Sequence, residues 1–229
     1  MRYTTLLLDL DHTLFDTAVS EKAAFEATLG AEGVDEPLRH LEVYIEINLA
    51  LWAAVERGEL TPQEVHVLRF ERLAAAIGLD TEPEPMAARF AVGLGAHGEL
   101  FDGARDVLGR LAERVSLALV TNGLSEVQRA RIERLDIGHF FHAVLISAEL
   151  GVAKPARAMF DAAFDALASP DKKTALMVGD SLSSDIRGGA DYGIATCWYN
   201  PQGKSADPDV RISHEITRLE QLVVLAAGD

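Results

Sequence analysis

The sequence feature that most constrains the fold is a run of leucines that ends abruptly in acidic residues: the run at 6–8 is followed by Asp9 and Asp11. Successive apolar residues are typical of a strand that is covered on both faces, as in a parallel sheet between two helical layers. Side chains alternate along a strand, so we expect both carboxylates on the same side. Because ligands of such sheets bind beyond the carboxyl ends of the strands, the two acids are candidate functional residues.

Composition narrows the class of protein and of partner. With 229 residues, of which 48% are hydrophobic and 25% charged, the chain can bury a large core, as one domain or as a domain with a smaller insert. The net charge of -15 argues against nucleic-acid polymers and acidic membrane surfaces as partners. The single Cys197 excludes an internal disulfide, and no segment has the pattern of a secretory signal or a membrane span. We therefore expect a cytoplasmic protein.

The region that follows Asp16 has the periodicity of helices and contains no convincing strand. Four helices are expected there: Val19–Leu29, Pro37–Arg57, Pro62–Ile77 and Met86–Leu94. The third has the clearest start, because Thr61 and Glu64 have the spacing of a capping box and Pro62 suits a first helical turn. The region is predicted to be a small all-helical domain.

From Phe101 onward, apolar strand patterns alternate with helix patterns. The predicted strands are Leu117–Val120, Ala143–Ile146, Thr174–Val178 and Ala195–Tyr199, and the predicted helices are Ala104–Arg114, Glu126–Leu135, Ala156–Ala168, Ser183–Asp191 and Arg218–Ala226. This alternation predicts an α/β fold with a Rossmann-like three-layer core and a mainly parallel sheet. Residues 1–16 and 96–229 would form that core, with residues 17–95 inserted after its first strand.

Polar residues follow three of the predicted strands. They are Asp9 and Asp11, then Thr121 and Asn122, then Asp180 with Asp185 five residues on. If these strands are neighbours, the groups converge at one edge of the sheet, where four carboxylates require a cation. Oxygen ligands with room for water favour Mg²⁺. Thr121, the backbone N–H groups of residues 122–123 and Lys154 could supply the donors that a phosphoryl group needs.

These segments resemble the four successive motifs of the haloacid-dehalogenase-like superfamily, in the same order. The matching segments are Asp9-Leu10-Asp11-His12-Thr13, Leu119-Val120-Thr121-Asn122-Gly123, Lys154-Pro155 and Gly179-Asp180-Ser181-Leu182-Ser183-Ser184-Asp185. The helical insert is similar to the small helical cap of the subfamily that includes phosphatases and dehalogenases. Within it, Thr121-Asn122-Gly123-Leu124 and the segment 196–201 are most similar to pyrimidine 5′-nucleotidases.

The resemblance implies a Mg²⁺-dependent phosphomonoester hydrolase that acts on a small phosphorylated metabolite, here a pyrimidine nucleoside 5′-monophosphate. Asp9 would form an aspartyl-phosphate, and Asp11 would protonate the leaving oxygen and then activate water. The phosphoryl oxygens would be held by Thr121, Asn122 and Lys154. The ligands of Mg²⁺ would be Asp9, the backbone carbonyl of Asp11, Asp180 and Asp185. His12 stands where the family often has Gly, and we interpret it as structural.

Several alternatives share parts of this pattern. A phosphatase of another metabolite, such as phosphoglycolate, a sugar phosphate or a sialic-acid phosphate, would satisfy the same core motifs. A 2-haloacid dehalogenase also uses a nucleophilic Asp, but Asp11 and the acidic last motif argue against it. A phosphonatase would need an amine from the cap, where Lys22 is the only lysine. A phosphorylation-controlled receiver domain needs no helical insert. The sequence carries no signal of oligomeric state.

Overall fold

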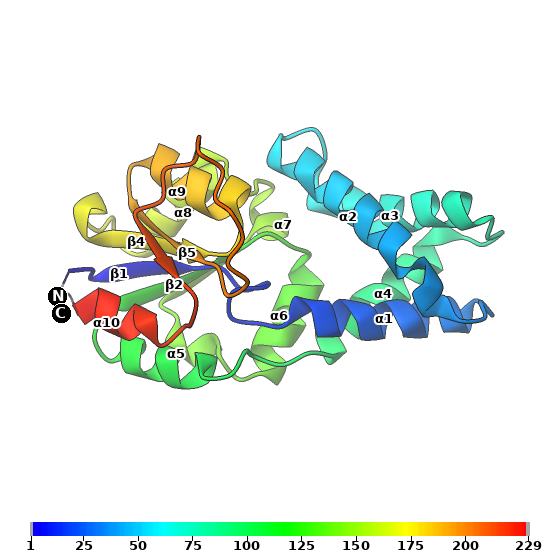
Figure 1. Ribbon diagram of the computed structural model, residues 1–229, viewed down its shortest axis with the longest axis horizontal. Coiled ribbons are helices and arrows are strands. Elements are labelled where there is room, and N and C mark those ends of the chain that lie inside the picture. Colours follow the sequence, from blue (N-terminus) through cyan, green and yellow to red (C-terminus); the bar gives the residue numbers. More distant parts are fainter. Residues whose placement is uncertain (1, 228–229) are drawn as a thin grey trace.

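The computed structural model describes residues 2–227, and within them the strands form one six-stranded parallel sheet in the order β3-β2-β1-β4-β5-β6 (Figure 1). The strands are β1 (Thr5–Leu8), β2 (Ser116–Thr121), β3 (Ala143–Ile146), β4 (Ala175–Gly179), β5 (Ala195–Tyr199) and β6 (His214–Ile216). The predicted α/β fold with a Rossmann-like core is confirmed. The leucine run belongs to β1, which lies in the middle of the sheet.

Helices cover both faces of this sheet. They are α5 (Ala104–Ala112), α6 (Ser125–Arg134), α7 (Ser147–Leu150), α8 (Arg157–Ala166), α9 (Arg187–Tyr192) and α10 (Gln221–Ala227). Figure 1 shows α5 and α10 on one face and α8 and α9 on the other. Leu6 and Leu8 are buried in the hydrophobic cluster on the α5 side, whereas Leu7 is buried in the cluster on the α8 side. Successive leucines occur in β1 because both of its faces are core.

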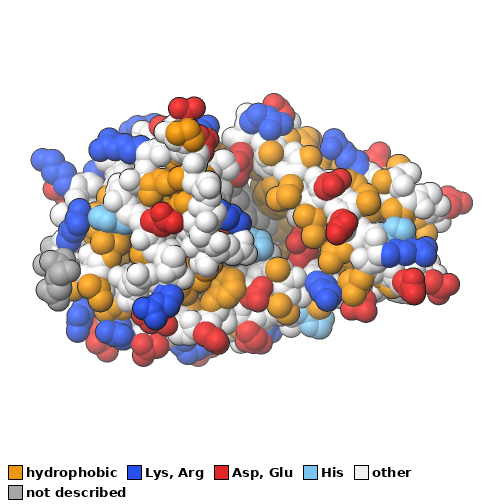
Figure 2. Space-filling view, in the orientation of Figure 1, with side chains coloured by type: hydrophobic (Ala, Val, Ile, Leu, Met, Phe, Trp, Pro, Cys, Tyr) orange, Lys and Arg blue, Asp and Glu red, His pale blue; other side chains and the backbone are white. Residues whose placement is uncertain are grey.

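Four helices between β1 and α5 lie apart from the sheet and pack around a second hydrophobic cluster, which Leu124 and Val127 at the start of α6 also join. They are α1 (Thr17–Ala31), α2 (Leu41–Glu56), α3 (Pro62–Ile77) and α4 (Pro83–Ala96), and we call residues 17–96 the helical body. Its core is built around Phe25, Tyr44, Phe70 and Phe90. The helical body stands beyond the carboxyl end of β1, and the surface between it and the sheet is hollowed (Figures 1 and 2). None of the helices in residues 2–227 has the length and apolarity to cross a membrane.

The structure corrects several local predictions. The first strand ends at Leu8, so the alternation rule does not place Asp11. A 3₁₀ turn, Pro37–His40, precedes α2, where one continuous helix was predicted. A π-helical turn, Leu182–Ile186, precedes α9. The edge strand β6 and the short helix α7 were not predicted. The capping box of α3 is confirmed: the Glu64 N–H donates to Thr61 Oγ1 at 3.3 Å, and the Thr61 N–H donates to Glu64 Oε2 at 2.7 Å.

Candidate active site

The candidate site lies where three neighbouring strands end. In the sheet β1 is flanked by β2 and β4, so their carboxyl ends meet on the side of the helical body (Figure 1). Asp9 follows β1, Thr121 is the last residue of β2, and Asp180 follows β4. The convergence of these segments, which are far apart in the sequence, therefore follows from the strand order. Open α/β sheets bind their ligands at this edge, beyond the carboxyl ends of the strands.

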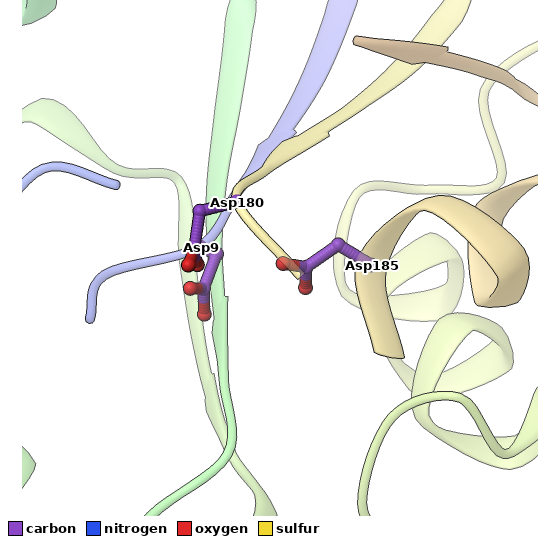
Figure 3. Close-up of side chains that lie close together, drawn as sticks. All are labelled: Asp9, Asp180 and Asp185. Carbon is purple, nitrogen blue, oxygen red and sulfur yellow. The ribbon is translucent and has the colours of Figure 1, made fainter. Parts of the chain in front are cut away.

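Three of the predicted acidic residues form one cluster. Asp9, Asp180 and Asp185 each contribute a carboxylate oxygen, and these oxygens lie within 4.8 Å of one another (Figure 3). Asp9 is 6% exposed and Asp185 is fully buried. Carboxylates at this separation repel each other strongly in a site with so little water, so the cluster requires positive charge.

Lys154 supplies part of that charge. Its side chain is buried, and Nζ donates to Asp9 Oδ1 at 2.6 Å and to Asp185 Oδ1 at 2.7 Å. The Asn122 side chain fixes the Lys154 backbone, because Oδ1 accepts from the Lys154 N–H at 2.8 Å and Nδ2 donates to the Lys154 carbonyl at 3.0 Å. Burial lowers the pKa of Lys154, but Asp185 and Asp9 outweigh burial and raise it, so the amine is charged.

The acidic cluster remains under electrostatic strain despite Lys154. Burial raises the pKa of Asp9 well above its ordinary value; Lys154 opposes this shift and Asp185 adds to it. Burial, with the neighbouring Asp185, raises the pKa of Asp180 to about 6. Three carboxylates and one ammonium leave an excess of negative charge, which a bound divalent cation would neutralise.

The turn after β4 holds the last two acids in place. The Ser181 N–H donates to Asp185 Oδ2 at 3.1 Å, and a side chain at Gly179 would collide with the Asp185 carboxylate. The Asp180 backbone is fixed on both sides, because its N–H donates to Thr13 Oγ1 at 3.1 Å and its carbonyl accepts from Trp198 Nε1 at 2.9 Å. The lack of a side chain at Gly179 therefore allows the Asp185 carboxylate to pack against the backbone at this position.

Asp11 lies outside the acidic cluster and has a different set of partners. Its carboxylate accepts from Arg131 Nη1 at 2.5 Å, Gln128 Nε2 at 2.5 Å and Thr17 Oγ1 at 2.6 Å. Burial raises the pKa of Asp11, but Arg131, Thr17 and Gln128 outweigh burial, so the pKa falls below its usual value. The structure therefore holds Asp11 as a carboxylate, the form that accepts a proton.

Sequence reasoning missed Gln128 and Arg131. Both lie in α6, which follows the predicted Thr121-Asn122 motif, and both are buried although the helix is mostly polar. A signal was present: residues three apart share a helix face, and here that face also carries the buried Val127 and Ile132. Polar residues on the apolar face of a helix point to a specific partner inside the protein.

The predicted phosphate-binding residues lie beside these acids. Thr121 is fully buried, and its hydroxyl accepts from Gln128 Nε2 at 3.0 Å, which leaves the hydroxyl proton for another acceptor. Lys154 has three N–H donors, and the two carboxylates account for two of them. The Asn122 side chain is turned to Lys154, so its backbone N–H is the group to consider for phosphate.

His12 lies in the tight turn that directly follows Asp11. Its φ is 59°, in the left-handed region that glycine adopts with least strain and that His tolerates better than most residues. The side chain is exposed. This conformation gives a physical reason for glycine at that position in related proteins and agrees with a structural role for His12.

Comparison with known proteins agrees with this geometry. A family model of haloacid dehalogenase-like hydrolases matches residues 3–193. The chain belongs to this family. The pyrimidine 5′-nucleotidase PynA of Streptococcus pneumoniae is 34% identical over 224 residues, which cover 97% of this chain and 94% of PynA. The pyrimidine 5′-nucleotidase YjjG of Escherichia coli is 31% identical over 230 residues, which cover 96% of this chain and 98% of YjjG.

A solved structure shares both the fold and the arrangement of the helical body. It is the haloacid dehalogenase-like hydrolase YfnB of Bacillus subtilis with bound magnesium, 31% identical, with a TM-score of 0.91 and coverage of 99% of both chains. The resemblance inferred from the four motifs is thus confirmed, and the chain is a hydrolase of this family. The bound magnesium is an observation made on YfnB and not on this chain.

The chemistry of the residues in this chain fits a magnesium ion. Asp9, Asp180 and Asp185 offer hard oxygen donors, and a bound cation would oppose the burial and the neighbouring Asp185 that together raise the pKa of Asp180 to about 6. When bound, Mg²⁺ would neutralise charge on a phosphoryl group and on its nucleophile.

The first prediction follows from Asp180. Its pKa rises from 3.8 to about 6 on folding, so without Mg²⁺ it contributes stability at low pH that is lost as pH rises through about 6. Mg²⁺ binds the ionised carboxylates and reverses that loss. We expect Mg²⁺ to raise the melting temperature more at about pH 7.5 than at about pH 5. Asp180→Asn is the matched control and should reduce the difference, although the raised pKa of Asp9 remains. Equal Mg²⁺ shifts at both pH values would contradict this site.

Proposed function

We propose that this chain is a Mg²⁺-dependent phosphomonoester hydrolase with an aspartyl-phosphate intermediate on Asp9, and that its substrates are pyrimidine nucleoside 5′-monophosphates. The observation that carries the mechanism is the different environment of the two acids. Asp9 shares an acidic cluster with Lys154, whereas Asp11 has a hydrogen-bond set of its own. Two carboxyl groups of one loop are thereby suited to different tasks.

The proposed reaction has two steps. In the first, a carboxylate oxygen of Asp9 attacks phosphorus, the bond from phosphorus to the ester oxygen breaks, and the leaving alkoxide takes a proton from Asp11. In the second, Asp11 takes a proton from water, which attacks the same phosphorus and releases phosphate from Asp9. The first step needs Asp11 protonated, and the second needs it ionised, the form that Arg131 favours.

The proposed phosphate-binding groups surround the position that the phosphoryl group would take. Thr121 would donate its hydroxyl proton, Asn122 its backbone N–H and Lys154 its third N–H. Mg²⁺ would be held by Asp9, the backbone carbonyl of Asp11, Asp180 and Asp185. Because Asp9, Asp185 and Lys154 have little contact with water, these electrostatic interactions would be stronger than at an open surface.

We further propose that residues 17–95 act as a cap over a core formed by residues 1–16 and 96–229. The cap reaches the core at Glu56, the last residue of α2. Burial raises the pKa of Glu56, and hydrogen bonds from the Ser183 and Ser184 hydroxyls oppose that shift. The Glu56 carboxyl group therefore lies against the turn after β4, which carries Asp185. A closed cap would keep water from the intermediate and contact the leaving group.

The nucleotide assignment is supported by the two full-length pyrimidine 5′-nucleotidase relatives. Trp198, the aromatic residue of the core nearest the acids in the predicted pattern, offers no face for stacking a base, because it is 2% exposed and donates its N–H to the Asp180 carbonyl. A base would therefore meet the cap. The glyceraldehyde 3-phosphate phosphatase of Methanopyrus kandleri, 31% identical over 94% of this chain and 91% of its own, supports a phosphatase of another small metabolite as the alternative.

The second prediction is the outcome of a substrate panel. Phosphate release should depend on Mg²⁺, and UMP, dUMP or dTMP should rank among the better substrates, above glyceraldehyde 3-phosphate and phosphoglycolate. The control is a parallel assay of halide release from 2-chloropropionate, where we expect none. A sugar or triose phosphate that outruns every nucleotide would replace the substrate assignment but leave the phosphatase mechanism. Halide release without phosphate release would overturn both.

A further inference from the structure

Arg131, whose only part in the reaction so far is to favour the ionised form of Asp11, joins the proposed proton donor to both ends of the helical body. It is 2% exposed, and its guanidinium donates to Gln128 Oε1 of its own helix at 3.5 Å and to three groups outside that helix. Nη1 binds Asp11 Oδ1 at 2.5 Å, Nε binds the Leu94 carbonyl at 2.9 Å, and Nη2 binds the Ser20 hydroxyl at 3.3 Å. One side chain of the core thus contacts the catalytic loop, α1 and α4.

The contacts on the helical body are at its two connections to the core. Ser20 lies in the first turns of α1, and Leu94 lies near the end of α4. The Ser20 hydroxyl also donates to the Leu94 carbonyl at 2.9 Å, so the two connections are joined at the point where Arg131 binds them. A rigid shift of the helical body would move both contacts of the guanidinium together.

The Asp11 side of this arrangement is linked to the helical body as well. Thr17, the first residue of α1, donates its hydroxyl to Asp11 at 2.6 Å and accepts from the His12 N–H at 3.2 Å. Gln128 donates to both Asp11 and Thr121. The carboxylate of Asp11 therefore has partners from the core and from the helical body at the same time.

Burying a guanidinium is costly, and the geometry shows how the cost is offset. The Asp11 carboxylate balances the charge, and the Phe15 ring lies 4.4 Å from the guanidinium carbon. Only the planar fork of arginine presents donors in the three required directions. A lysine could keep the charge near Asp11 but could not hold all three groups in one plane.

We propose that Arg131 is a positioning residue that fixes the Asp11 carboxylate relative to both ends of the helical body, so that proton transfer to the leaving oxygen depends on how the helical body is seated. This inference rests on the proposed role of Asp11. It assigns to Arg131 a coupling between the helical body and the chemistry, beyond its contribution to stability.

The test compares Arg131→Lys with wild type in single-turnover reactions on UMP and on p-nitrophenyl phosphate, with Mg²⁺. An alkoxide needs a proton to leave, whereas a nitrophenolate leaves with little help. A misplaced Asp11 should slow the first step with UMP by about 10²-fold and slow the nitrophenyl ester much less. Equal slowing of the two esters would mean that Arg131 acts only on stability or binding, and would overturn the proposal.

Arg134 provides a matched control, one turn farther along α6. It donates to the carbonyls of Gly95, His97 and Gly98, so it also ties the end of the helical body to the core, but none of its hydrogen bonds within the described residues goes to Asp11. Arg134→Lys should change the rates of the two esters alike. Selective slowing of UMP by this variant would show that any loss of core contacts has that effect, and would refute a specific role for Arg131.

Asp11→Asn separates the failure of this proposal from that of the proposed function. If Asp11→Asn slows both esters equally, Asp11 is not the proton donor and the proposed mechanism is wrong. If it slows UMP selectively but Arg131→Lys does not, only the proposal for Arg131 is wrong. In the double variant, Arg131→Lys should add no further selectivity, because residues that act through one another are not additive.

Ser20→Ala tests the contact with the helical body while it leaves the Arg131 and Asp11 pair intact. It removes one buried hydroxyl and no charge, so it also serves if Arg131→Lys does not fold. We expect a smaller slowing than for Arg131→Lys, again selective for UMP. Wild-type rates on both esters would contradict the coupling to the helical body.

Discussion

Replacing Asp9 with Asn is expected to abolish turnover of every phosphate ester, by about 10⁶-fold, the scale on which loss of a catalytic nucleophile acts. The amide keeps the shape of the carboxyl group but cannot form the acyl-phosphate. Lys154 retains its contact with Asp185 at 2.7 Å, so the fold should persist. The measurement is steady-state phosphate release at saturating Mg²⁺, with the melting temperature taken on the same sample.

Asp16→Asn is the matched control for this change. Asp16 stands at the end of the same loop and caps α1, because its Oδ1 accepts from the Val19 N–H at 3.2 Å. Asn caps helices about as well as Asp, so this variant should keep nearly full activity. Mg²⁺-dependent turnover by Asp9→Asn at more than trace levels would move the nucleophile to another residue.

Lys154→Met is expected to give the second largest effect, on both activity and stability. It removes the only cation that the structure places between Asp9 and Asp185 in the described residues, so two buried carboxylates lose their partner. Removing one member of a buried ion pair costs about 3–5 kcal/mol of folding free energy. Losing a donor to the phosphoryl group should cost turnover about 10²-fold or more.

Mg²⁺ distinguishes these two effects. It should restore much of the stability of Lys154→Met, since it neutralises the same carboxylates, but it should not restore turnover, since it does not replace the N–H donor. Urea unfolding and phosphate release, each with and without Mg²⁺, measure the two. Lys173→Met, at an exposed lysine, is the control and should behave as wild type. Unchanged kinetics in Lys154→Met would exclude Lys154 from the phosphate site.

The general fold could be predicted because the order of apolar and polar residues along the chain indicates which segments are buried strands and where helices begin. The leucines of β1 report a strand with core on both faces, and the capping box at Thr61 and Glu64 gives the start of α3. β6 could not be predicted in the same way. It is three residues long, contains His214 and Glu215, and is defined only by pairing with β5.

The candidate site was predictable to the extent that strand order determines it. Asp9, Asp180 and Asp185 meet because they follow the adjacent strands β1 and β4; the alternation of elements predicted a parallel sheet but left the order of its strands as a condition. The partners of Asp11 could not. Arg131 is 120 residues away in the sequence, and its contact with Asp11 depends on how α6 packs against the ends of the helical body.

The most direct test of the central claim is to trap the covalent intermediate. Wild-type protein with Mg²⁺ is mixed with UMP, quenched in acid within one turnover, digested and analysed by peptide mass spectrometry. We predict a phosphate on the peptide that contains Asp9, lost on treatment with hydroxylamine and absent from Asp9→Asn. Rapid turnover with no acyl-phosphate at any quench time, or phosphate on another residue, would contradict the mechanism.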